Sequence, residues 1–247
     1  MKRKLIAAIA CRSSGKRLYG KPLQNLDIEK NLSILEFIIS KLKKKKCIKN
    51  IVLGIANDAG FDVYKNFAKK NSIDYIFGNE NDVLSRLIKC AKSVDGTDVF
   101  RITSESPFTF LENLEKTWKK HKDHGYDATF LDNVVDGCGY EIIKLKALQV
   151  SHSNGKSRHR SELCTLYIRE NFKKFKIYKI TPPKYLIRND LRLTVDYPED
   201  LIVCRSIYKK FKSKINHKKI INYLDKNSYL KKLIKNFTVE GYKTMYK

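Results

Sequence analysis

Acidic residues, paired cysteines and flexible linkers are all scarce in this chain of 247 residues. The six cysteines stand alone, with no C-x-x-C pair and no histidine at zinc-finger spacing, so neither a zinc module nor a disulfide framework is indicated. No stretch rich in Pro, Gly and Ser divides the chain. The 42% hydrophobic and 31% charged residues are typical of a globular protein and exclude a disordered, collagen-like or membrane-embedded one. We therefore expect no membrane insertion.

The shortage of acidic residues leaves a strong positive charge. There are 51 Lys and Arg residues against 26 Asp and Glu, which gives a net charge of +25. Clustered positive charge indicates nucleic-acid or anionic-membrane partners. Here the lysines are spread along the chain, with short runs at Lys43–Lys46 and Lys218–Lys219, and no nucleic-acid reader motif accompanies them. We expect a solvated basic surface, anionic small substrates and no specific nucleic-acid partner.

The first apolar run, Leu5–Cys11, follows a basic start and superficially resembles a signal peptide. It is too short for one and enters Arg12 without a small-residue cleavage pattern. We interpret it as a buried strand of a cytoplasmic protein.

Apolar runs of strand length alternate with longer stretches of helical period. This alternation predicts a three-layer α/β/α sandwich around a mostly parallel, Rossmann-like sheet. Strands are predicted at Leu5–Ala10, Ile51–Ala56, Asp74–Phe77, Val99–Ile102, Ala128–Leu131, Glu141–Lys144, Lys176–Ile180 and Arg192–Val195. Helices are predicted from a Ser33 cap through Lys43, at Phe61–Lys70, at Asp82–Ser93, from Pro198 onward, and around Ile220–Leu224 and Leu230–Ile234. We expect one domain over residues 1–247, with 198–247 as a helical extension.

The loop after the first strand, Cys11–Leu23, contains four cations, two glycines and two serines. Glycines permit close backbone approach and cations neutralise phosphate charge, so the loop suits a polyphosphate. It is neither a Walker loop nor a G-x-G-x-x-G turn. On composition alone, a basic surface loop is an equally good interpretation.

The spacing R-x-x-[SG]-x-R-L-x-G-K-P-L of this loop resembles the nucleotide loop of the cytidylyltransferases. Four more segments follow in the family's order: Gly78–Arg86 resembles G-x-E-x-D-V-L-x-R, Arg101–Pro107 resembles R-I-T-G-D-C-P, Tyr167–Asn171 matches Y-I-R-E-N, and Leu191–Leu201 resembles L-R-L-T-V-D-T-P-E-D-L. Together they resemble most closely the group named for spore-coat polysaccharide synthesis protein F. That group is related to the enzymes that make CMP-sialic acid and CMP-activated 3-deoxy-manno-octulosonate.

The resemblance implies a single nucleotidyltransferase domain with the fold of nucleotide-diphospho-sugar transferases. It implies transfer of CMP from CTP to a sugar acid or another small anionic acceptor, with release of pyrophosphate, in surface-polysaccharide synthesis. Mg²⁺ is the implied cofactor, and relatives suggest a homodimer.

The resemblance also assigns site residues. Arg12, Arg17 and Lys21 match triphosphate-binding positions, within a cradle that includes Ser14, Gly15 and Gly20. Arg12, Lys21 and Asp196 are the expected catalytic residues. Lys16 is interpreted as a solvated neighbour.

Asp196 and Glu105 are the expected metal ligands. Asp196 matches the family's metal-binding aspartate and follows an apolar run. Glu105 stands where the family's G-D-C-P segment has aspartate, and Ser104 stands where it has glycine. The carboxylate is kept but lengthened by a methylene group. For Asp200, close behind, a helix-capping role is favoured.

Four further residues are placed beside the nucleotide by the resemblance, and three of them have a structural alternative. Asn79 and Asp82 lie in the Gly78–Arg86 segment, where Asp82 is either a ligand contact or a helix cap. Arg86 either contacts nucleotide or pairs with Asp82 one helical turn away. Arg101 contacts phosphate or acceptor, or forms a structural ion pair.

The acceptor side departs from the family pattern. Asp136–Glu141 resembles D-G-L-D-V-E, but Cys138 replaces leucine and Gly139 replaces an aspartate, which suggests an altered acceptor pocket. We expect His159, in the polar stretch before Tyr167, to be an exposed loop residue.

Two other functions remain open on the sequence. The departures at Ser104, Glu105 and Gly139 suit a degenerate relative that binds nucleotide without transferring it. The second open function is that of a glycosyltransferase of similar fold. Such an enzyme would use a metal-binding D-x-D triplet, which the chain does not have.

Overall fold

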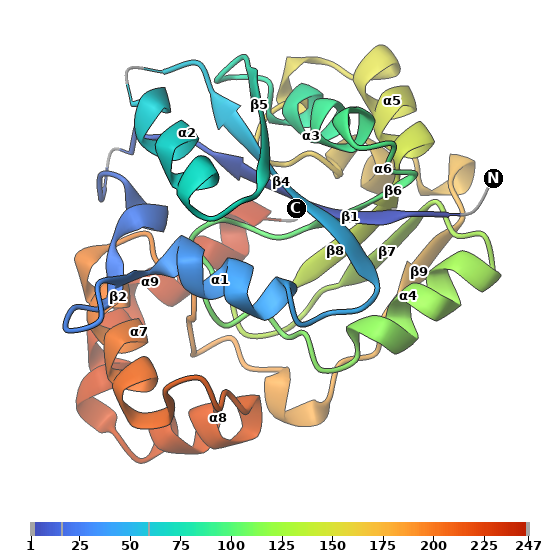
Figure 1. The fold of residues 1–247 in the computed structure, drawn as a ribbon. Helices are drawn as coiled ribbons and strands as arrows, with labels where there is room; N and C mark the ends of the chain where they lie inside the picture. Colours follow the sequence, from blue (N-terminus) through green and yellow to red (C-terminus); the bar gives the residue numbers. More distant parts are fainter. Residues whose placement is uncertain (1–2, 16, 59, 246–247) are drawn as a thin grey trace.

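A seven-stranded sheet forms the centre of the molecule in the computed structural model, which describes residues 3–15, 17–58 and 60–245 (Figure 1). The strand order is β5-β4-β1-β6-β8-β7-β9. Their bounds are β1 Leu5–Cys11, β4 Ile48–Ala56, β5 Asp74–Gly78, β6 Asp98–Arg101, β7 Ala128–Leu131, β8 Tyr140–Lys144 and β9 Ile177–Lys179. Only β8 runs against its neighbours β6 and β7, and the other pairs are parallel. The predicted mostly parallel sheet is confirmed.

Helices cover both faces of the sheet because the side chains of each buried strand alternate between two cores. In β1, Ile6 and Ala8 face one core, whereas Leu5, Ala7 and Ile9 face the other. The first core is covered by α3 (Val83–Ser93), α5 (Leu145–Asn154) and α6 (Leu166–Glu170). The second is covered by α1 (Ile34–Leu42), α2 (Phe61–Lys70), α4 (Leu114–Asp123), α7 (Pro198–Phe211), α8 (His217–Asp225) and α9 (Ser228–Met245). The three-layer α/β/α prediction is confirmed.

The predicted start of α1 is also confirmed. Ser33 accepts a hydrogen bond from the Glu36 backbone N–H at 3.1 Å, and the Glu36 carboxylate accepts one from the Ser33 N–H at 2.9 Å. This reciprocal capping box satisfies two backbone donors that the first helical turn leaves unpaired. A small sheet of β2 (Asn25–Asp27) and β3 (Leu32–Ser33), not predicted, precedes the helix.

The strand predicted at Arg192–Val195 is wrong. Only an isolated bridge joins Arg192 to Asp136, because this segment bonds to two loops instead of one strand. Leu193 N–H donates to the Asp136 carbonyl at 2.7 Å, and Val195 N–H donates to the Glu105 carbonyl at 3.0 Å. The segment therefore ties the loop after β6 to the loop before β8.

His159 is buried rather than exposed, and it belongs to the short 3-10 helix Ser157–His159. Its Nε2 lies 2.8 Å from Glu170 Oε2, and its Nδ1 accepts from the Lys156 N–H at 2.7 Å. These bonds make it a structural residue of the connection between α5 and α6.

After Tyr197 the described chain is helical, as predicted, although α8 and α9 extend beyond the predicted cores Ile220–Leu224 and Leu230–Ile234. Figure 1 shows α7, α8 and α9 grouped at one end of the molecule, in orange and red. Within the part of the chain that the structure describes, no helix combines the length and the apolar character needed to cross a bilayer.

Gly137 allows the loop before β8 to pass close to the Arg192–Val195 segment. Its φ of +88° is unfavourable for any residue with a Cβ, and a Cβ there would lie 2.5 Å from the Leu193 carbonyl carbon. Gly125 also has a positive φ, +64°, but a Cβ there would meet nothing within 4 Å.

We predict that Gly137→Ala lowers the free energy of unfolding by about 3 kcal/mol, because backbone strain and a backbone clash add together. Gly125→Ala, the matched control, adds strain alone and should cost about 1 kcal/mol. Urea denaturation of both variants measures the difference. Equal losses would show that the approach to Leu193 is not tight.

Candidate functional site

The predicted phosphate-binding loop and the two predicted metal ligands meet at one edge of the sheet. The loop leaves the carboxyl end of β1, and Glu105 follows the carboxyl end of the neighbouring strand β6. The Val195–Glu105 backbone hydrogen bond brings Asp196, the next residue, to the same place. In open α/β sheets, ligands bind outside the carboxyl ends of the strands.

Asp58, two residues past β4, holds the start of the loop in shape. Its carboxylate accepts hydrogen bonds from the Ser13 N–H at 2.6 Å, the Ser13 hydroxyl at 2.8 Å and the Gly60 N–H at 3.1 Å. Burial raises the pKa of Asp58, but these hydrogen bonds outweigh it and leave the pKa below its usual value. The Tyr64 hydroxyl also donates to the Arg12 carbonyl at 3.0 Å. Sequence reasoning missed Asp58, although a carboxylate just past a buried strand was a usable signal.

The two loop glycines are needed for its path. A Cβ on Gly15 would lie 2.5 Å from the Leu18 carbonyl oxygen, and Gly20 has a φ of +55° at the start of the 3-10 helix Lys21–Leu23. Ser14 donates from its hydroxyl to Glu80 Oε1 at 2.5 Å, toward the loop after β5. The backbone is therefore folded tightly, as a cradle for phosphate requires. Lys16 lies outside the described residues.

Two of the three predicted triphosphate-binding cations meet at Asp196. Lys21 Nζ lies 2.5 Å from Asp196 Oδ1, and Arg17 Nη2 lies 3.3 Å from the same oxygen. Arg12 is not part of this group: its Nη2 lies 2.5 Å from Glu162 Oε1, at the exposed rim. The structure thus joins Arg17, Lys21 and Asp196, and places Arg12 with Glu162.

Asp196 and Glu105 differ in charge environment although they are neighbours. Burial raises the pKa of Asp196, but the hydrogen bond from Lys21 and the charges of Lys21, Arg192 and Arg17 outweigh it, so the pKa lies below its usual value. Burial raises the pKa of Glu105, and the nearby Asp196 charge adds to the increase against the opposing effect of Lys21. Ser104 donates its hydroxyl to Glu105 Oε2 at 2.8 Å. The serine that replaces glycine thus orients the longer carboxylate.

This donor set fits Mg²⁺. The ion prefers hard oxygen ligands and commonly takes one or two carboxylates together with substrate phosphates. Within residues 3–15, 17–58 and 60–245, no three His, Cys, Asp or Glu side chains cluster as a complete metal site. Two carboxylates that interact electrostatically, beside the predicted phosphate-binding loop, would suit an ion that arrives with a nucleotide.

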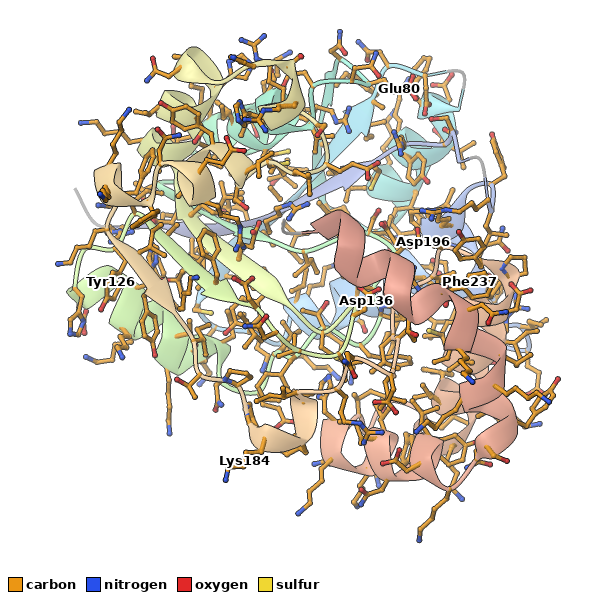
Figure 2. All side chains as sticks on the ribbon, turned by 180° about the vertical axis from the view of Figure 1, so that it is seen from behind. Glu80, Tyr126, Asp136, Lys184, Asp196 and Phe237 are labelled. Carbon is orange, nitrogen blue, oxygen red and sulfur yellow. The ribbon has the colours of Figure 1, made fainter. Side chains whose placement is uncertain are left out.

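Arg192 is buried next to Asp196 and was not predicted as a site residue. Its side chain is 3% exposed and contacts the carboxylates of Asp136, Asp196 and Asp200. Burial lowers its pKa, but the three negative charges outweigh this and raise the pKa above its usual value. Asp200 also accepts from the Tyr197 N–H at 3.0 Å, which confirms its predicted capping of α7. Figure 2 shows Asp136 and Asp196 on the side of the molecule that α9 crosses.

The Gly78–Arg86 segment shows structural roles for its charged residues. Asp82 caps α3 by accepting from the Ser85 N–H at 2.8 Å, and its other oxygen lies 2.8 Å from His152 Nε2. Arg86, 1% exposed, donates to the carbonyls of Asn79 at 2.5 Å and Glu80 at 2.9 Å. It thus supports the backbone of the loop after β5 instead of pairing through its guanidinium with the Asp82 carboxylate.

Arg101 forms the ion pair that was one of its two interpretations. Its Nη1 lies 2.9 Å from Glu141 Oε2, and Nη2 donates to the Glu162 carbonyl at 2.7 Å. Glu141 also contacts Arg169 at 2.9 Å, and Arg169 contacts Asp132 at 2.8 Å. Burial raises the pKa of Glu141, but the two arginines lower it to about 2. Arg101, Glu141, Arg169 and Asp132 thus form a network of ion pairs beside β8.

Two natural proteins are similar to the chain over almost all of it. An uncharacterised protein, MJ1063, of Methanocaldococcus jannaschii is 29% identical over 97% of this chain and 98% of its own. The spore coat polysaccharide biosynthesis protein SpsF of Bacillus subtilis is 24% identical over 90% of this chain and 95% of its own.

Two solved structures share the fold. A cytidylyltransferase from Leptospira borgpetersenii serovar Hardjo-bovis superposes with a TM-score of 0.83 at 24% identity, covering 95% of this chain and 98% of its own. A CMP:2-keto-3-deoxy-manno-octonic acid synthetase complexed with CTP superposes with a TM-score of 0.60 at 12% identity, covering 84% and 99%.

The sequence profile of the Cytidylyltransferase family matches residues 6–235, which include every residue placed in the site above. The match confirms the resemblance inferred from the motifs. The chain belongs to the cytidylyltransferase family, and it is therefore a nucleotidyltransferase.

Proposed function

We propose that the protein transfers CMP from CTP to a sugar acid or another small anionic acceptor, releasing pyrophosphate, in surface-polysaccharide biosynthesis. The observation that carries the proposal is the meeting of Arg17 and Lys21 with Asp196 at the edge of the sheet where the predicted phosphate-binding loop lies. The family match supports the nucleotide. The names of the Bacillus subtilis relative and the octonic acid synthetase support the pathway and the acceptor class.

Triphosphate binding uses the cations that now neutralise Asp196. A triphosphate brings several negative charges, so Lys21 and Arg17 gain more by contacting its oxygens than by sharing one carboxylate. The folded backbone between Gly15 and Gly20 lets its N–H groups approach those oxygens. Arg12, half-exposed beside Glu162, is the third cation assigned to the nucleotide.

Asp196 and Glu105 would hold Mg²⁺ together with phosphate oxygens. When bound, the ion would supply positive charge against the negative charge that develops around the α-phosphorus. Ser104 keeps the Glu105 carboxylate oriented for this role through its 2.8 Å hydrogen bond.

The reaction is a displacement at the α-phosphorus of CTP. An acceptor oxygen forms a new bond to that phosphorus, and the bond to the bridging oxygen of the β-phosphate breaks. Pyrophosphate leaves with the electron pair, and the acceptor hydroxyl proton passes to solvent. A phosphorylated acceptor would give a CDP derivative by the same step. Lys21 and Arg17 stabilise the charge that accumulates on pyrophosphate.

We also propose the setting in which the reaction takes place. Residues 1–247 act as one nucleotidyltransferase domain with 198–247 as its helical extension, working in the cytoplasm as a homodimer, without a nucleic-acid partner. The spread of lysines along the chain supports a basic surface that attracts anionic substrates.

One observation favours a second candidate function. Ser104 and Glu105 replace the family's Gly-Asp pair, and glutamate sets the carboxylate one methylene group further from the backbone than aspartate does. On this alternative the protein binds CTP without transferring CMP. The glycosyltransferase alternative has no such support.

Pyrophosphate release tests the proposed reaction. With Mg²⁺ and a panel of sugar acids and phosphorylated small molecules, CTP should give acceptor-dependent release that ATP, GTP and UTP do not. Asp196→Asn should lower kcat/KM by about 10²–10³-fold, since it removes a charge that acts on the transition state. CTP binding without release across the panel would instead support the degenerate binder.

Variants at Glu105 test the second carboxylate. Glu105→Gln should lower kcat/KM by about 10–100-fold and raise the Mg²⁺ concentration needed for half-maximal rate, whereas Glu105→Asp should keep a larger part of the activity. Asp62→Asn, an exposed carboxylate paired with Lys65, is the matched control. An unchanged Mg²⁺ dependence in Glu105→Gln would remove Glu105 from the metal site.

A further inference from the structure

We propose that Tyr197 and Phe237 form an aromatic stack that positions Arg17 for the triphosphate. The inference rests on the proposed function, because it concerns the same site. It adds two positioning residues, one of them in the C-terminal helix α9.

The contact chain is continuous from α9 to the site. The rings of Phe237 and Tyr197 are stacked, with centroids 4.0 Å apart and planes inclined by 18°. The Arg17 guanidinium carbon lies 4.8 Å from the centroid of the Tyr197 ring, and its Nη1 donates to the Tyr197 hydroxyl at 3.3 Å. Its Nη2 lies 3.3 Å from Asp196 Oδ1. The Tyr197 ring is therefore in contact with both Phe237 and the Arg17 guanidinium.

The Tyr197 ring is held by the start of α7. Tyr197 is the residue before Pro198, which favours extended backbone, and its φ and ψ are −118° and 159°. Its N–H donates to the Asp200 carboxylate at 3.0 Å, which in turn contacts the buried Arg192. The ring thus projects from a backbone anchored in the same charge network that holds Asp196.

Helical spacing places Phe237 on the same face of α9 as two buried residues. Leu230 and Ile234 are buried in the large core, and Phe237 follows them at the interval that keeps all three on one face. Figure 2 shows α9 running across this side of the molecule, with Phe237 and Asp196 labelled close to it. Phe237 lies two residues beyond the region that matches the family profile. Tyr197 stands where the family motif quoted above has threonine.

The stack matters because it restricts the orientation of the Arg17 guanidinium. The Arg17 side chain is 42% exposed, and fixing a long arginine side chain at the moment of binding costs conformational entropy. A guanidinium held against an aromatic ring is oriented before the ligand arrives, and its planar form suits the ring as an ammonium does not. The effect should therefore fall on CTP affinity more than on the chemical step.

Three leucine variants test the stack in the full-length protein. Phe237→Leu and Tyr197→Leu should each raise the CTP dissociation constant, measured by calorimetry, and the KM for CTP by about three- to tenfold, with kcat changed less than about twofold. Phe211→Leu is the matched control, because Phe211 is half-buried and pairs with Tyr223, 5.7 Å away, between α7 and α8. It should leave KM unchanged at a similar loss of thermal stability. Tyr197→Phe, which keeps the ring, should retain most of the affinity.

A double-mutant cycle separates positioning from general packing. In an Arg17→Lys background, Tyr197→Leu should weaken CTP binding by less than about twofold, since the planar partner is already gone. Equal effects in both backgrounds, or an equal shift in Phe211→Leu, would overturn the proposal.

The two proposals fail differently. If the wild-type protein binds CTP but releases no pyrophosphate, the proposed reaction is contradicted. The CTP dissociation constants of the wild type and the stack variants still test the role of the stack. If the wild-type protein turns over CTP and the stack variants match it in KM, the stack is contradicted alone. Absence of CTP binding in the wild type would overturn both.

Discussion

The negative charge of Asp196 organises the site, because a partly buried carboxylate must be matched by positive charge. Lys21 and Arg17 contact the Asp196 carboxylate from the loop after β1, and the buried Arg192 contacts it from the interior of the protein. Each contact ties a different segment to the same point. Arg192 also binds Asp136 and so joins the loop before β8 to the start of α7. The loop after β1 is thereby held at the sheet edge by electrostatics as well as by packing.

Because Lys21 and Arg17 share the Asp196 carboxylate, both cations could exchange that contact for the oxygens of a bound triphosphate. On the proposed function, the cations that stabilise Asp196 are the ones that a triphosphate would attract, and their release would leave Asp196 available for a divalent ion. The backbone need not move for this, since Asp58 fixes the beginning of the loop independently through Ser13. A rigid frame with exchangeable charges reduces the cost of organising the site when nucleotide binds.

The sequence allowed the fold and the positions of Asp196, Lys21 and Arg17 to be predicted, because hydrophobic alternation and motif spacing are local properties. It did not reveal Arg192, whose three carboxylate partners come from two segments about 60 residues apart. The strand prediction around Arg192 was wrong because the apolar pattern of that segment results from burial between two loops, which depends on tertiary structure. For Arg86 and Arg101 the sequence left both a ligand contact and a structural role open, because their burial and partners depend on tertiary structure. The Tyr197–Phe237 stack likewise requires α9 to be placed against α7.

On the proposed function, Asp196 competes with the triphosphate for Lys21 and Arg17, and this competition can be measured as CTP binding in the absence of metal. Calorimetry in EDTA should show that Asp196→Asn binds CTP more tightly than the wild type, because Lys21 and Arg17 are no longer held by the carboxylate. With Mg²⁺ the order should reverse, since the variant lacks a metal ligand. Weaker CTP binding by Asp196→Asn in EDTA would contradict the account.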